Sequence, residues 1–176
     1  MREVVIIEGV RTAVARRKGS LSHTRADDLA AMVLDKLVNK AGVDKSLVED
    51  VILGCVSQVS EQGGNIARTA ALIAGFPSYV PGVTIDRQCG SSQQAVHFAA
   101  QAIASGDMEI VIAGGVESMT RVPMFSNMGD YKPSPKLTKS YEIINQGLSA
   151  ERIAEKWDLS REELDAFSVQ SHERAQ

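Results

Sequence analysis

The sequence predicts an α/β fold, with a mostly parallel sheet flanked by layers of helices. Four short apolar runs, rich in β-branched residues, have the length and composition of strands that are buried on both faces. Segments whose apolar residues recur at helical spacing separate these runs. Alternating strands and helices favour right-handed crossovers between parallel strands, so we expect a layered sheet with helices on both faces.

The first expected strand covers Val4 to Ile7 and ends at Gly9. A helix is expected to follow from Asp27, because the apolar residues after it fall three and four positions apart. Thr24 or Asp27 can cap its start, and Gly42 is suited to its end. This first strand and helix predict the beginning of the α/β alternation.

The second expected strand covers residues 51–56 and leads into a polar loop, residues 58–64. Asn65 can cap a small, alanine-rich helix that runs through Ala74. Pro77 forbids a continuation of this helix, because proline lacks a backbone N–H and its ring clashes with the preceding turn.

The third expected strand, residues 83–85, leads into a short turn and then a long helix. Gly106 is the expected stop of that helix. A fourth strand is expected at residues 109–113, directly before a pair of glycines.

The composition changes beyond Arg121, where proline, glycine, lysine and serine accumulate. We therefore expect one α/β domain over residues 1–120 and the incomplete start of a second domain over residues 121–176. Two helices are expected in this second part, one from Ser149 or Ala150 to Trp157 and one opened by a capping box at Ser160. The last helix has no stop signal before Gln176, which suggests that it belongs to a larger domain.

Charge and cysteine content exclude several classes of function. The net charge of -3 offers no broad positive field for nucleic acid. The N-terminal apolar run is too short for a signal peptide or a membrane span. Two cysteines cannot build a disulfide framework, and the three histidines, His23, His97 and His172, show no metal-ligand spacing. We expect a cytoplasmic protein with no metal, no nucleic acid and no membrane partner.

Cys89 is the candidate catalytic residue, because it lies between the end of a strand and the start of a helix. The unpaired backbone N–H groups and the positive end of a helix favour a thiolate at this position. Ligands of open parallel sheets collect at the edge where the strands end. The arrangement is similar to the nucleophile elbow of hydrolases, with sulfur in place of oxygen.

Each of these residues also has a structural interpretation. A free cysteine is often a small buried hydrophobe, and this interpretation suits Cys55, which lies within an apolar strand, better than Cys89. His97 lies about two helical turns from Cys89, too far for direct proton transfer. The glycine pair at residues 114–115 belongs to no nucleotide-binding pattern. No base for Cys89 is visible in the sequence, and no residue can be assigned to cofactor binding.

Several motifs resemble the thiolase family, in the order in which that family has them. They are Val10-Arg11-Thr12, Gly63-Gly64-Asn65-Ile66-Ala67-Arg68, Cys89-Gly90-Ser91-Ser92 and Gly114-Gly115-Val116-Glu117-Ser118-Met119-Thr120. The segment from Ile153 to His172 is similar to the start of the family's loop domain. The resemblance implies a thiolase-like N-terminal half with part of a loop domain.

The resemblance also implies an activity, acyl transfer between coenzyme A thioesters in fatty acid metabolism. Cys89 would accept the acyl group and pass it on, in thiolysis of a 3-ketoacyl-CoA or in Claisen condensation of acetyl-CoA. The backbone N–H of Cys89 would supply one oxyanion donor. Coenzyme A would be a substrate rather than a bound cofactor, and the protein would form a homodimer or homotetramer, with residues 58–68 near the dimer contact.

Family members are more than twice this length, and the second half carries the remaining catalytic groups. A Gly-His-Pro-like histidine, a second cysteine in a Cys-x-Gly motif and an Asn-Glu motif would lie beyond Gln176. We therefore expect the 176-residue chain to be inactive by itself. Asp86 and Gln93 depart from the commoner Asn and aliphatic residues of the family, which favours the degradative or steroid side-chain branch. A salt bridge of Asp86 with Arg87 or Arg68 would need no catalytic role.

Two other classes of function stay open at this point. A ketoacyl synthase shares the nucleophile turn, but its other signatures do not match. A non-catalytic dimeric α/β module, or a redox sensor in which Cys89 is oxidised reversibly, would need no acyl donor.

Overall fold

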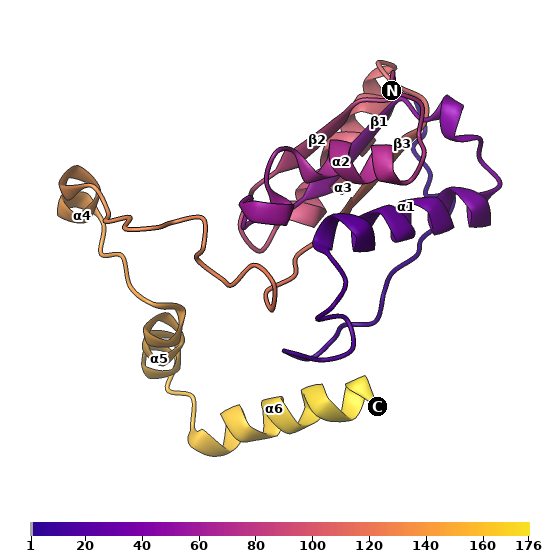
Figure 1. Ribbon diagram of the computed structural model, residues 1–176. Coiled ribbons are helices and arrows are strands. Elements are labelled where there is room, and N and C mark those ends of the chain that lie inside the picture. The colour runs from indigo at the N-terminus through magenta and orange to yellow at the C-terminus, as the bar shows by residue number, and fades with distance from the viewer. Residues whose placement is uncertain (1) are drawn as a thin grey trace. The chain divides into compact units, whose positions relative to one another are not determined.

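A computed structural model describes residues 2–176 of the chain (Figure 1). The chain divides into two compact units, one up to Gly129 and one from Asp130 to Gln176. The two units are described separately below. The assignment of domains to residues 1–120 and 121–176 stays a prediction.

The first unit contains a parallel sheet of three strands, β1 (Asp50–Gly54), β2 (Gly82–Ile85) and β3 (Val111–Gly115). The order across the sheet is β2-β1-β3, and β1 pairs in parallel with both neighbours. Gly54 at the end of β1 is in register with Ile85 on one side and Gly115 on the other. The three strands therefore end together at one edge of the sheet.

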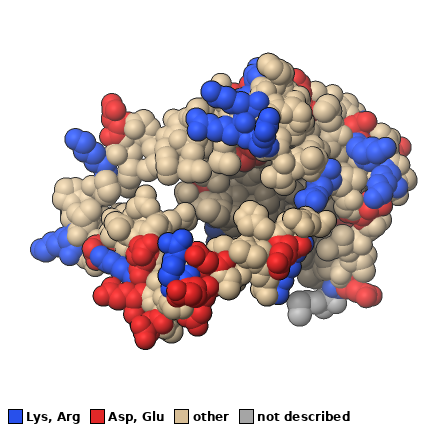
Figure 2. Space-filling view, turned by 90° about the horizontal axis from the view of Figure 1, so that it is seen from below, with Lys and Arg blue, Asp and Glu red and all other residues tan. Residues whose placement is uncertain are grey.

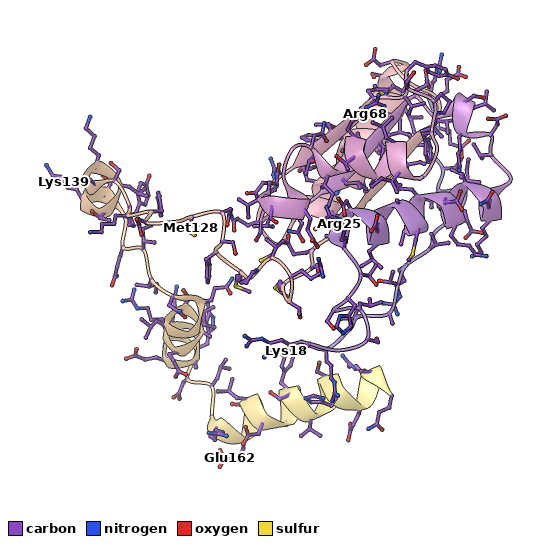
Figure 3. All side chains as sticks on the ribbon, in the orientation of Figure 1. Lys18, Arg25, Arg68, Met128, Lys139 and Glu162 are labelled. Carbon is purple, nitrogen blue, oxygen red and sulfur yellow. The ribbon has the colours of Figure 1, made fainter. Side chains whose placement is uncertain are left out.

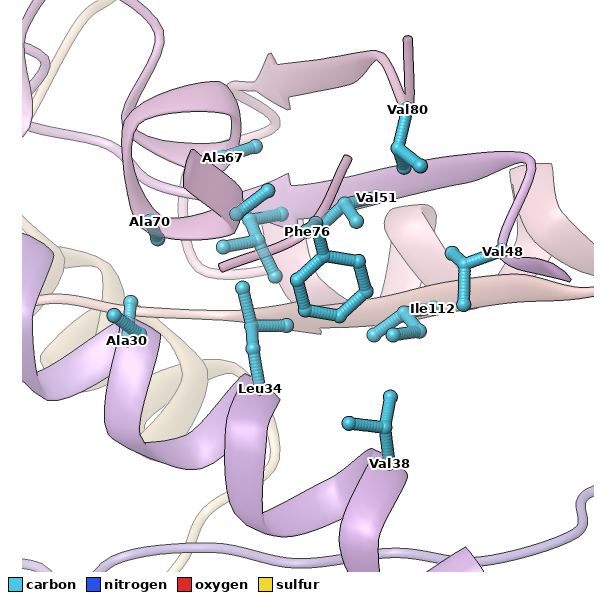
Figure 4. Close-up of a cluster of buried hydrophobic side chains, with 13 residues drawn as sticks. Ala30, Leu34, Val38, Val48, Val51, Ala67, Ala70, Phe76, Val80 and Ile112 are labelled. Carbon is cyan, nitrogen blue, oxygen red and sulfur yellow. The ribbon is translucent and has the colours of Figure 1, made fainter. Parts of the chain in front are cut away.

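Helices cover both faces of this sheet. Alternate side chains of a strand point to opposite faces, and β1 follows this rule. Val51 and Leu53 join the main hydrophobic core with α1 (Ala26–Ala41) and α2 (Ile66–Ile73). Ile52 packs instead against α3 (Ser91–Ser105). Figure 4 shows the main core, in which Phe76 and Leu34 meet the strands. The predicted α/β class is confirmed.

Several predicted ends of helices are confirmed. Gly42 and Gly106 both have left-handed backbones after α1 and α3, and Asn65 accepts a hydrogen bond from the N–H of Arg68 at the start of α2. The predicted cap of α1 is wrong. Arg25 occupies the cap position without a side-chain bond, and the N–H of Ala26 donates to Glu61 from elsewhere in the chain.

The first predicted strand is wrong. Residues 4–7 form no strand, and their apolar side chains are exposed, up to 85% for Ile6. The apolar run indicates a segment suited to a sheet, but a strand also needs a neighbour to pair with. Among the described residues, no backbone ladder joins residues 4–7 to β3 or to another strand. The predicted fourth strand exists, displaced by two residues to Val111–Gly115.

The second unit contains three helices, α4 (Pro135–Ser140), α5 (Gln146–Lys156) and α6 (Arg161–Ala175), none of which has a buried residue. The short α4 was not predicted. The predicted start of α5 is wrong, because Asn145 caps the helix and Ser149 and Ala150 lie inside it. The predicted capping box of α6 is confirmed, with Ser160 and Glu163 bonded reciprocally.

The surface carries charges of both signs. On the face that Figure 2 shows, basic and acidic side chains lie in small groups separated by uncharged surface. Across residues 2–176, no helix is both long and apolar enough to cross a membrane.

Candidate active site

Two chain segments leave the sheet side by side at the edge where the strands end. The first, which we call the β1 loop, is Cys55–Gln58, and the second, the Cys89 turn, is Asp86–Gly90. The two segments begin next to each other, because the N–H of Cys55 donates to the carbonyl of Ile85 at 3.0 Å. Each segment contains one of the two cysteines of the chain.

Cys89 is exposed in its turn, directly before Gly90, the cap residue of α3. The structure therefore places it between the end of β2 and the start of a 15-residue helix. Its thiol has no hydrogen-bond partner among residues 2–176, and its backbone N–H donates to none of them. The unpaired N–H groups of a helix start provide a partial positive charge at such a position.

The Cys89 turn has an unusual backbone that several hydrogen bonds hold in place. Gln88, which is not glycine, has a left-handed φ of 47°. Its N–H donates to Asp86 Oδ1 at 2.7 Å, and the N–H of Gly90 donates to the carbonyl of Arg87 at 3.0 Å. The hydroxyl of Ser91, the first residue of α3, completes the turn, since it accepts from Arg87 N–H and donates to the carbonyl of Gln88.

Two glycines allow the start of α3 to touch the sheet. A Cβ atom on Gly54 would lie 2.4 Å from the backbone nitrogen of Ser92, and one on Gly115 would lie 1.8 Å from the Ser92 hydroxyl oxygen. Sequence reasoning considered the 114–115 pair as a possible nucleotide loop and as part of a family motif, and not as a point of contact with a helix. A glycine inside a strand often marks a close approach of another backbone, and that signal was available for both positions.

Cys55 is the opposite of Cys89 in exposure. Its side chain is 1% exposed and packs with Ala26 and Ile66. Burial, with smaller contributions from the charges of Glu117 and Asp86, raises the pKa of the Cys55 thiol to about 12. The prediction that Cys55 is a packing residue is confirmed.

A polar network closes the β1 loop, and sequence reasoning did not find it. The carboxylate of Glu117 accepts from the N–H groups of Val56 and Ser57 and from the amide of Gln62. Gln62 is fully buried and also donates to the carbonyl of Ser57 and accepts from Ser118 N–H. Gln62 and Glu117 both lie in or beside the quoted family motifs, but nothing local indicates that they meet.

A second network ties the start of α1 to the segment after β3. Arg121 binds Glu61 through two hydrogen bonds of 2.6 and 2.8 Å, and Arg25, which Figure 3 labels, binds Asp27 in the same way at 2.9 and 2.7 Å. Hydrogen bonds from Arg121 are the main reason that the pKa of Glu61 lies below its usual value. These four charges are internally paired and fix the frame around the β1 loop.

The remaining candidate residues lie away from the Cys89 thiol. His23, His97 and His172 are exposed, and none bonds to Cys89. Within residues 2–176, no group of three potential ligands could hold a metal ion. The suggested salt bridge of Asp86 is wrong. The described ion pairs do not include Asp86, and Arg68 donates instead to the carbonyls of Ser78 and Val80.

Cys89 lines neither of two cavities in the first unit. One of about 280 Å³ lies between residues 8–12, α1 and β3. The other, of about 630 Å³, lies between residues 12–17 and 117–124. Glu117 lines both cavities. No acidic or basic side chain that lines either cavity makes a hydrogen bond to the Cys89 thiol. The Cys89 turn is thus an open site on the surface, suited to a nucleophile that meets its substrate from solvent or from another part of a protein.

Comparison with known proteins gives a consistent result. The family description "Thiolase, N-terminal domain" matches residues 4–176. The chain is 46% identical to a steroid 3-ketoacyl-CoA thiolase of Mycobacterium tuberculosis and 44% identical to a 3-ketoacyl-CoA thiolase of Idiomarina loihiensis. It is 42% identical to a β-ketoadipyl-CoA thiolase of Pseudomonas aeruginosa. These alignments cover 99% of the chain and 46–48% of the relatives, so the chain spans about half the length of the curated relatives it matches.

Proposed function

The chain belongs to the thiolase family, and from this premise we propose that it carries the nucleophilic half of an enzyme that transfers acyl groups between coenzyme A thioesters. The observation that carries the proposal is the position of Cys89. It is the exposed cysteine of the two, it precedes the N-terminus of α3, and it lies at the edge where the parallel strands end. Ligands of open α/β sheets bind at this edge.

In the proposed reaction, the Cys89 thiolate attacks the 3-keto carbon of a 3-ketoacyl-CoA. The bond between carbons 2 and 3 breaks, and the electron pair leaves on carbon 2 of the departing acetyl-CoA, which takes up a proton. The acyl group stays on sulfur as a thioester. The thiol of a second coenzyme A then loses its proton and attacks this thioester, which releases the shortened acyl-CoA and restores the Cys89 thiolate.

The backbone N–H of Cys89 is suited to stabilise the negative oxygen that develops in these steps. It donates to no other described residue, so it is available to an oxyanion. Loss of one such donor typically lowers the rate by about 10²–10³. Coenzyme A is in this proposal a substrate, and no cofactor is held covalently.

We propose that the physiological reaction runs in the direction of thiolysis rather than condensation. The support is that the relatives named above are described as thiolases of 3-ketoacyl or β-ketoadipyl substrates. The departures at Asp86 and Gln93 favour the same branch. A cytoplasmic location is part of the proposal, and two free thiols suit a reducing compartment. A homodimeric or homotetrameric assembly is also part of it, as the family resemblance implies.

The groups that move protons are proposed to come from the remainder of the thiolase polypeptide. Within residues 2–176, no base reaches Cys89. We therefore expect no catalytic turnover from the 176-residue chain, but a single acylation of Cys89.

Intact-mass measurement tests the proposal. After incubation with acetoacetyl-CoA or acetyl-CoA, we expect one acetyl group per chain, absent in Cys89→Ser and retained in Cys55→Ala. Acetylation that survives in Cys89→Ser would overturn the assignment of the nucleophile. Reversible oxidation of Cys89 without any acylation would favour the redox-sensor alternative, and turnover by the wild-type chain that Cys89→Ser abolishes would contradict the expected inactivity.

A further inference from the structure

We propose that Ser91 is a positioning residue for Cys89, and that it acts through the backbone of the Cys89 turn rather than by touching the sulfur. The inference gains its catalytic meaning from the proposed function. It rests on the geometry of the turn, on the burial of the Ser91 hydroxyl and on the contact between α3 and β1.

The first observation is the pattern of bonds that the hydroxyl makes. Ser91 Oγ accepts a hydrogen bond from the N–H of Arg87 at 2.9 Å and donates one to the carbonyl of Gln88 at 2.6 Å. These two residues directly precede Cys89. One side chain thus fixes both the incoming peptide and the outgoing carbonyl of the turn.

The second observation is that the turn needs such a restraint. Gln88 has a left-handed φ of 47°, a conformation that residues with a side chain adopt rarely and that persists only when the surroundings enforce it. The bond from Gln88 N–H to Asp86 Oδ1 is made at the exposed side of the turn. The Ser91 bonds are made beneath it, where the side chain is 4% exposed and water does not compete.

The third observation is that Ser91 is itself anchored. A Cβ atom on Gly54 would lie 2.8 Å from the Ser91 Cβ atom, so the first residue of α3 rests on the end of β1. Contact with the sheet therefore fixes the position of Ser91, and the two hydrogen bonds of its hydroxyl hold the turn in place relative to the sheet. Loss of the hydroxyl would let Gln88 relax and would move Cys89 away from the N-terminal end of α3 and its unpaired N–H groups.

Alkylation of the two thiols tests this inference without any acyl transfer. Iodoacetamide is added to the 176-residue chain at neutral pH, and the labelling of Cys89 and Cys55 is followed separately by peptide mass spectrometry. In Ser91→Ala, we expect the rate at Cys89 to fall about three-fold or more, because the turn no longer holds the sulfur at the N-terminal end of α3. Buried Cys55 stays unlabelled, which reports that the unit remains folded.

A matched control and a rescue separate positioning from packing. Ser105→Ala removes a hydroxyl at the other end of α3, where it bonds only its own helix, and should leave both rates unchanged. Gln88→Gly, added to Ser91→Ala, should restore the rate at Cys89, because glycine adopts the left-handed conformation without the restraint. A packing role for Ser91 would not be rescued in this way.

Two results would overturn the inference: a wild-type rate at Cys89 in Ser91→Ala, or a double variant as slow as the single one. If Ser91→Ala also exposes Cys55, Ser91→Thr decides, since it keeps the hydroxyl. In Ser91→Thr, alkylation of Cys89 at the wild-type rate with Cys55 unlabelled supports the inference, and slow alkylation of Cys89 refutes it. If Cys89 is not acylated in the experiment described above, the proposed function is refuted, but the comparison of alkylation rates among these variants still tests the role of Ser91.

Discussion

The β1 loop and the Cys89 turn leave neighbouring strands at the same edge, yet they hold their cysteines in opposite environments. Cys55 is buried at the start of a loop whose N–H groups at Val56 and Ser57 donate to Glu117, which also accepts from the amide of Gln62. Cys89 is exposed above a turn whose own bonds point inward to Ser91. The comparison indicates that the exposure of each thiol depends on which backbone groups the nearby polar side chains bond to. It does not depend on the strand that precedes the cysteine.

The contact of α3 with β1 is the feature on which this comparison depends most. Gly54→Ala would place a methyl group 2.4 Å from the backbone of Ser92, and backbone atoms cannot move aside as a flexible side chain can. We expect a loss of about 3 kcal/mol in the free energy of unfolding, as for overpacked cores. Urea denaturation followed by circular dichroism measures it.

Gly90→Ala is the matched control for that variant. Gly90 lies in the Cys89 turn itself, but a Cβ atom there would have no neighbour closer than 3.5 Å, and its φ of -93° suits any residue. We expect a change within about 0.5 kcal/mol. A loss at Gly90 as large as that at Gly54 would show that the turn, rather than the contact between helix and strand, determines the stability of this edge.

The second prediction concerns the polar network that closes the β1 loop over Cys55. Gln62→Ala removes a fully buried amide that bonds Ser57, Glu117 and Ser118. Buried polar groups left without partners destabilise, so we expect a loss of about 2 kcal/mol and labelling of Cys55 by iodoacetamide. Gln101→Ala, an exposed position on α3, is the control and should change neither quantity. Cys55 that stays unlabelled in Gln62→Ala would show that packing alone protects the thiol.

The parts of the fold that the sequence predicted are those set by neighbouring residues. The runs at β1 and β2, the glycines that end α1 and α3, and the capping box of α6 all act within a few positions of themselves. The position of Cys89 between a strand and a helix belongs to this class, because the patterns on either side of it are local.

The parts that failed depend on distant partners. Residues 4–7 have the composition of a strand, but pairing needs a neighbour that composition does not reveal. The start of α1 is capped by Glu61, 35 residues away, where the sequence offered Thr24 and Asp27 nearby. The same holds at the site, where Gln62 meets Glu117 across 55 residues. Only the strand glycines at positions 54 and 115 carried a local sign of the close contacts that they make.

The last prediction uses pH to test the burial of the Cys55 thiol. Burial raises the pKa of the Cys55 thiol from 9.0 to about 12, so the folded chain keeps a proton that the unfolded chain releases. Between pH 9 and 12 the unfolded state binds fewer protons, and the free energy of unfolding must fall as the pH rises. Relative to pH 8, we expect Cys55 to cost the wild type about 1.4 kcal/mol by pH 10, which Cys55→Ala should not lose. Urea titrations of both proteins at the two pH values measure this difference. A Cys55→Ala chain that loses as much as the wild type would show that other groups, not the buried thiol, account for the alkaline sensitivity.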